Sequence, residues 1–279
     1  MIKLQKFESV DEYLAHCYNA PKNLPNLPLA DEDFISNWKE RNGSEVLNFF
    51  NQNLHLPVDK FEWNNISDLK IEFAQTSGGK LPVITTADHV DFRQMVAILN
   101  GKDEVSDLPV TVNAFTINAK AEQIYSNRVI LLNYAPYSNV SAEKLNLSKE
   151  DWLKKSHLLR LRHESAHYET LRIFGGMRNH ALDEILADCL GQIAAFGDFN
   201  ADRQRLFFGL HGNKCDGRLQ FYCRNVILEE RSKIYQAVDS ILDYIAREVK
   251  KLQNSSSSDF AIIKFIACQN IPSHLSEKF

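Results

Sequence analysis

The spacing of apolar residues changes near residue 148, and this change constrains the fold more than any other feature of the chain. Before it, short segments alternate apolar and polar residues, as β-strands do. After it, apolar residues recur at helical spacing over long segments. We therefore expect an α+β fold, with a mixed α+β half at residues 1–147 and a mainly helical half at residues 148–279. The two halves are expected to form one continuous domain.

The first half is expected to contain about four strands, because its apolar residues alternate and turn residues separate the segments. The strand candidates are residues 69–76, 81–87, 110–119 and 128–134. A helix is expected to follow Asp88 as its N-cap and to stop at Gly101. A further helical segment within residues 31–54 is interrupted at Asn42-Gly43.

The second half is expected to be helical throughout. Ser148 and Asp151 have the spacing of a capping box, and the Gly175-Gly176 pair marks the end of the helix that they begin. The next helix is expected to open at Asn179 and close at Gly197. The remaining helices are expected at 200–210, as one long amphipathic helix at 218–252, and at 260–267.

Composition excludes several classes of protein. The formal net charge is −4 and there is no basic tract, so nucleic acid is not expected as a partner. The sequence has no signal peptide and no apolar run of membrane-spanning length, which predicts a cytoplasmic protein with no membrane partner. Five cysteines without a Cys-x-x-Cys pair predict free thiols and argue against a thiolate zinc site.

One segment, RHESAHYETLRIFGGMRNHALDEILAD, combines residues that bind metals. His163 and His167 are four residues apart on a predicted helix, so both imidazoles face the same side and can share one ion. In this His-Glu-x-x-His pattern Glu164 does not bind the metal but acts as general base on water. A catalytic zinc ion needs a third protein ligand and leaves its fourth position open.

Three alternatives compete for the third ligand. The metzincin pattern would need Gly and His where Thr170 and Ile173 stand, which excludes it. The second alternative is Glu184, at the border of the apolar stripe of the next helix. The third alternative is His180, one turn before Glu184. The register favours Glu184, with Asp188 one turn further on to accept the free N–H of a ligand histidine.

His163-Glu164-x-x-His167 followed by Glu184-x-x-x-Asp188 resembles the gluzincin metallopeptidases, the thermolysin-like clan. The resemblance implies a zincin-like fold, with one Zn²⁺ held by both histidines and the glutamate. It covers residues 162–191 and does not place the chain in a characterised family of the clan. The segment VNAFT is similar to the edge strand of many zincins, and it implies a substrate contact near Asn113.

Other polar residues are candidates for contacts with substrate or with the oxyanion of the reaction. Such a group stands opposite the zinc ion in gluzincin peptidases, but no motif identifies it in this chain. The candidates are His180, His211, Tyr222, Arg218 and Tyr168, and a structural role is an alternative for each of them.

The sequence thus predicts a zinc-dependent metallopeptidase that acts on a peptide or protein substrate. One alternative is a cytosolic zinc-binding regulatory or interaction protein of zincin fold, similar to ImmA-like proteins, without general proteolytic activity. Another is a helical scaffold with no metal. The sequence does not indicate the substrate, endo- or exo-cleavage, or the oligomeric state.

Overall fold

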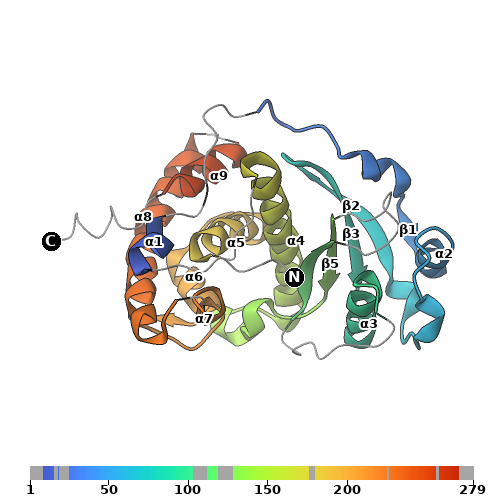
Figure 1. The fold of residues 1–279 in the computed structure, drawn as a ribbon. Coiled ribbons are helices and arrows are strands. Elements are labelled where there is room, and N and C mark those ends of the chain that lie inside the picture. The colour runs from blue at the N-terminus through green and yellow to red at the C-terminus, as the bar shows by residue number, and fades with distance from the viewer. Residues whose placement is uncertain are drawn as a thin grey trace. The chain divides into compact units, whose positions relative to one another are not determined.

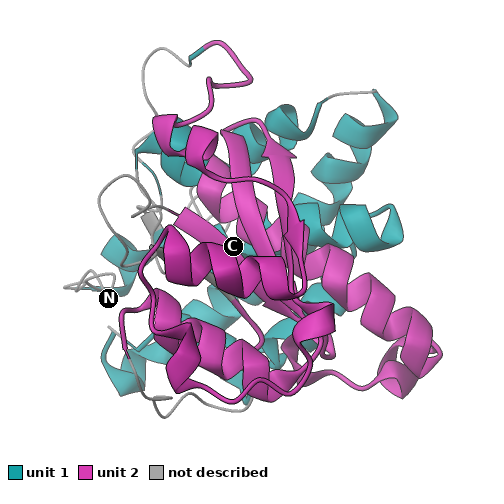
Figure 2. Cartoon of the chain, turned by 90° about the vertical axis from the view of Figure 1, so that its right-hand side faces the viewer, with its two compact units in different colours: residues 1–25, 170–279 teal, residues 26–169 magenta. Residues whose placement is uncertain are grey.

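The computed structural model describes residues 9–15, 18, 25–102, 112–118, 128–175, 180–224, 226–255 and 258–269. The chain forms two compact units, residues 26–169 and residues 1–25 with 170–279 (Figure 2). The division falls inside the long helix α4 and not at residue 148, where the apolar spacing changes. No helix of the described segments is long and apolar enough to cross a membrane.

The unit of residues 26–169 is built on a mixed five-stranded sheet with the order β1-β2-β3-β5-β4 (Figure 1). Strands β3 and β5 are parallel, and the other neighbours are antiparallel. The strands are β1 (Arg41–Asn42), β2 (Lys70–Thr76), β3 (Gly79–Thr86), β4 (Ala114–Asn118) and β5 (Arg128–Asn133). The four expected strands are confirmed, and β4 lies at an edge of the sheet as VNAFT predicted. The two-residue β1 is too short to produce a recognisable alternation.

Helix α3 (His89–Leu99) packs against β3 and β5 and supplies much of the core of this unit. The Asp88 side chain caps it, as expected, by accepting hydrogen bonds from the backbone N–H groups of Val90 and Asp91. Fully buried Phe92 and Met95 of α3 join the apolar side chains of the sheet in one core. The other short elements of this unit are η1 (Asp33–Asn37), α2 (Ser44–Gln52), η2 (Val58–Lys60), η3 (Ile66–Asp68), η4 (Tyr137–Asn139) and η5 (Ala142–Leu145).

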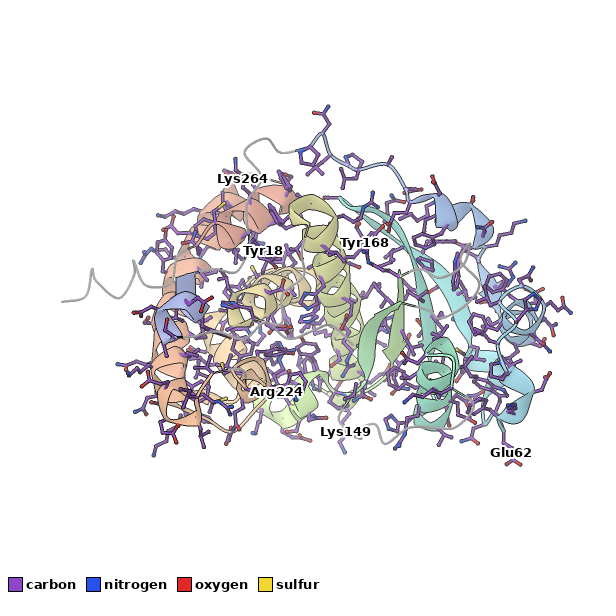
Figure 3. All side chains as sticks on the ribbon, viewed as in Figure 1. Tyr18, Glu62, Lys149, Tyr168, Arg224 and Lys264 are labelled. Carbon is purple, nitrogen blue, oxygen red and sulfur yellow. The ribbon has the colours of Figure 1, made fainter. Side chains whose placement is uncertain are left out.

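Helix α4 (Lys149–Phe174) carries the His-Glu-x-x-His segment. The Ser148 hydroxyl accepts a hydrogen bond from the backbone N–H of Asp151 and donates one to its carboxylate, so the expected start of the helix is confirmed. Gly175 ends the helix with a φ of 72°, a conformation that glycine adopts without strain. Buried Tyr168, which is labelled in Figure 3, belongs to the core of the unit. Its hydroxyl donates a hydrogen bond to Glu32.

The second unit is mainly helical. Its helices are α1 (Val10–Ala15), α5 (Ala181–Phe196), α6 (Ala201–Phe208), α7 (Leu219–Tyr222), α8 (Arg231–Asn254) and α9 (Asp259–Ala267). Helix α9 packs against α5 and α8, and α1 and α6 also pack against α8 (Figure 1). One face of α8 is buried at helical spacing, through Ile234, Val238, Ile241, Ile245 and Val249.

The single helix expected at residues 218–252 is wrong, because the structure divides it into α7 and α8 with the short turn η6 (Leu228–Glu230) between them. The Arg231 guanidinium donates to the carbonyl oxygens of Arg224 and Val226. At the break, this side chain therefore takes the place of backbone N–H donors that a continuous helix would supply. The hairpin of β6 (Leu210–His211) and β7 (Lys214–Cys215) was also not expected.

Candidate metal centre

Helix α4 brings the imidazoles of His163 and His167 together. Their Nε2 atoms are 3.1 Å apart, and both residues are 5% exposed. Two nitrogen ligands of a tetrahedral zinc ion, each about 2.0–2.1 Å from the metal, stand about 3.3 Å apart. The pair therefore has the chemistry and spacing of two zinc ligands. Glu164 follows His163 on the same helix and is half-buried.

Tyr137 holds the ring of His163 from the other side. The Tyr137 hydroxyl lies 3.0 Å from Nδ1 of His163, and both side chains are buried. When Nδ1 carries the ring proton and donates to this hydroxyl, Nε2 keeps its lone pair for a metal. The loop that bears Tyr137 is fixed to α4, because the Arg160 guanidinium donates to the carbonyl oxygens of Ala135 and Pro136.

Helix α5 carries Glu184 and Asp188, which are buried and one helical turn apart. The Arg218 guanidinium donates to the Asp188 carboxylate, and its Nη1 lies 3.9 Å from Oε2 of Glu184. Asp188 also accepts a hydrogen bond from the Gln204 side-chain amide at 2.5 Å. The Gln204 carbonyl in turn accepts from Gln192. A connected set of buried hydrogen bonds therefore positions the two carboxylates of α5.

Tyr222 and Asp183 also lie beside Glu184. Burial, followed by the nearby Glu184 carboxylate, raises the pKa of Tyr222 well above its usual range. Burial and the same carboxylate raise the pKa of Asp183, whose side chain accepts a hydrogen bond from the Tyr18 hydroxyl. Glu184 is thus the centre of a buried polar group in the helical unit.

Three of the other expected site residues have contacts of their own. His180 is the N-cap of α5, where its Nδ1 accepts from the backbone N–H of Leu182 and its Nε2 contacts the carbonyl oxygen of Tyr13. Because both ring nitrogens are engaged, this geometry does not favour His180 as a metal ligand. His211 is exposed in the β6–β7 hairpin, 3.5 Å from Asp216. Asn113 is buried directly before β4, and its carbonyl oxygen accepts from the backbone N–H of Asn133.

His163 and His167 belong to the unit of residues 26–169, and Glu184 belongs to the other unit. Each of the three residues is buried and has one atom that could bind a metal ion. Two imidazoles and one carboxylate are a donor set that suits catalytic zinc.

A family model described as "Family of unknown function (DUF7005)" matches residues 113–269, which is more than half of the chain. The chain belongs to this family. The matched DUF7005 region includes Tyr137, both histidines of α4 and both carboxylates of α5. No curated protein matches the chain, and no solved structure does.

The sequence did not predict two residues of this DUF7005 protein that hold the candidate site residues in place. Tyr137 lies 26 residues before His163, and Gln204 lies 16 residues after Asp188. Neither belongs to a motif, and both are placed by contacts between separate elements. Arg218 was expected only as a contact to the oxyanion, whereas in the structure it is the ion-pair partner of Asp188. The acidic residue Asp188 on an otherwise apolar helix was the signal in the sequence for a cationic partner.

Proposed function

We propose that this protein is a zinc-dependent hydrolase that cleaves peptide bonds. His163, His167 and Glu184 would hold one Zn²⁺, and Glu164 would be the general base. The close approach of the two buried Nε2 atoms carries the proposal, because this spacing suits two ligands of one ion. Glu184, the third ligand that the gluzincin resemblance implies, would complete the three-ligand set.

Zinc in this position would supply a Lewis acid that polarises a peptide carbonyl and makes nearby water more acidic. Glu164, half-buried beside the first histidine, accepts a proton from the attacking water and transfers it to the leaving amine. Tyr137 would hold the His163 ring in the tautomer that turns the lone pair of Nε2 toward the metal, by accepting a hydrogen bond from Nδ1–H. Arg218, held by Asp188, places positive charge 3.9 Å from the Glu184 carboxylate.

The proposal is tested with wild type, Glu164→Gln and Glu184→Ala. Zinc content and cleavage of a diverse peptide library are measured for each. We expect Glu164→Gln to keep zinc and lose cleavage by at least about a hundredfold, the size of a general-base contribution. We expect Glu184→Ala to lose most of both, because a three-ligand site would be reduced to two.

Glu150→Gln is the matched control, because Glu150 lies on the same helix and its carboxylate pairs with exposed Lys154. It should retain both zinc and cleavage. A wild-type protein that binds no zinc would refute the proposal. Full zinc occupancy without cleavage of any peptide would refute the peptidase and favour a zinc-binding protein with another role.

A further inference from the structure

A separate pocket lies in the unit of residues 26–169, and the proposed zinc ligands do not line it. Its volume is about 230 Å³. Its polar lining comes from Asp68 in η3, Lys70 and Glu72 in β2, Thr85 in β3, Tyr134 after β5, and His157 in α4.

The register of the sheet explains why these side chains meet. Lys70 pairs directly with Thr85 across β2 and β3, so both point to the same face. Glu72 is two residues from Lys70 and therefore shares that face. Thr85 also pairs with Leu132 of β5, and Tyr134 is two residues further on. His157 closes the pocket from α4.

Two polar atoms of this pocket are buried without a hydrogen-bond partner among the residues that the structure describes. They are the Thr85 hydroxyl oxygen and Nδ1 of His157. Thr85 is only 5% exposed. A buried polar group without a partner loses the hydrogen bonds that it makes with water in the unfolded chain. A ligand group that supplies hydrogen bonds at this point would therefore be bound favourably.

The charge of the lining favours a cation. Asp68 and Glu72 contribute two negative charges and Lys70 one positive charge, which leaves one net negative charge. His157 adds none at neutral pH, since burial, reinforced by Arg160, lowers its pKa. Its ring stacks on Tyr134 with the centroids 4.5 Å apart, which holds the imidazole in place.

We propose that this pocket binds a primary ammonium group through the Glu72 carboxylate, the Thr85 hydroxyl and Nδ1 of His157. A primary ammonium has three N–H donors and no acceptor. The three protein atoms are all able to accept, and one of them carries the opposite charge. The ligand would be an alkylamine, a lysine side chain or the N-terminus of a peptide.

The test uses the full chain and n-butylammonium as the probe, and binding is measured by NMR titration. We expect saturable binding that shifts the resonances of Thr85 and His157. Tetramethylammonium has the same charge but no N–H donor, and we expect it to bind at least about tenfold more weakly. Glycinamide, which carries an α-ammonium, distinguishes the two peptide sources. Equal binding of both amines indicates a peptide N-terminus, and preference for n-butylammonium indicates a lysine-like chain.

Three substitutions should change the affinity for n-butylammonium in opposite directions. Glu72→Gln should weaken n-butylammonium binding about tenfold, because it removes the negative charge while keeping an acceptor oxygen. Thr85→Val should weaken binding about fivefold, because it removes one acceptor. Lys70→Gln should strengthen binding severalfold, because it removes a competing cation. Glu150→Gln, which lies outside the pocket, should change nothing. Melting temperatures of all variants confirm that they fold, and exposed Glu72 tolerates its change without loss of packing.

Three results would overturn the proposal. The first is the absence of saturable n-butylammonium binding to the folded wild-type chain. The second is equally tight binding of tetramethylammonium. The third is preferential binding of butyrate that Lys70→Gln weakens, which would make the pocket an anion site.

Discussion

Replacing Tyr137 with Phe removes one hydroxyl group and leaves the buried ring in place. The hydroxyl lies 3.0 Å from Nδ1 of His163, whose Nε2 is a proposed zinc ligand. If Tyr137 fixes the tautomer of His163, the variant should bind zinc more weakly while its fold is retained. The ring contact between Tyr137 and the Arg160 guanidinium, 5.7 Å from the ring centroid, is unaffected.

The size of the effect follows from this one hydrogen bond. A neutral hydrogen bond contributes about 1 kcal/mol, and a bond to a charged group about 1.5–3 kcal/mol. A metal ion on Nε2 makes Nδ1–H a stronger donor, so the hydroxyl stabilises the metal-bound state more than the metal-free state. A difference of about 1.4 kcal/mol corresponds to a tenfold weaker zinc affinity. Substitution of such partners of ligand histidines weakens metal binding by about 10- to 100-fold.

Zinc affinity would be measured by competition with a chelator of known affinity at constant pH. Tyr134→Phe is the matched control, because Tyr134 stacks on His157 and not on His163. We expect the control to bind zinc as the wild type does. Equal zinc affinity of Tyr137→Phe and wild type, with both proteins folded, would refute the role assigned to Tyr137.

Three further predictions concern stability and reactivity. Asp88→Ala should lower the free energy of unfolding by about 1 kcal/mol in urea denaturation, because two backbone N–H groups lose their cap; an unchanged midpoint would contradict this. Burial raises the pKa of Cys223 to about 12, so at pH 8 it should react with a thiol reagent far more slowly than exposed Cys268, as peptide mapping would show. Burial lowers the pKa of His157 below that of the unfolded chain, so its contribution to stability is present above pH 6.5 and is lost as the pH falls through the folded value. His157→Phe should flatten this acid limb of the stability curve, and an identical slope in both proteins would argue against the assignment.

The main elements of the fold could be predicted from local patterns. Strands β2, β3 and β5 alternate or are continuously apolar, and α3 and α4 have capping residues that the structure confirms. The division of the predicted helix at 218–252 could not be predicted in this way. Apolar residues keep helical spacing on both sides of the break, and the break depends on Arg231, which donates to backbone oxygens five and seven residues earlier.

The residues of the candidate site could also be predicted only where they form a local sequence pattern. The motif predicted His163, Glu164 and His167 because these residues lie close together in sequence on one helix. Glu184 and Asp188 were predicted from the register of the next helix. Their supporting side chains come from elements distant in sequence, so no spacing rule could identify them. The role expected of Asp188, as acceptor for a ligand histidine, stays a prediction, and the structure adds its contacts with Arg218 and Gln204.

The hydrogen bonds from Gln192 through Gln204 to Asp188 all run in one direction. Each amide donates toward the carboxylate and accepts from the residue behind it, and the last carbonyl accepts from the backbone N–H of Asn200. Turning one amide over would place two donors or two acceptors face to face. The residues of this chain therefore cannot vary independently, and substitutions at positions 188, 192 and 204 should be strongly non-additive. Evolution or design would have to change these positions together.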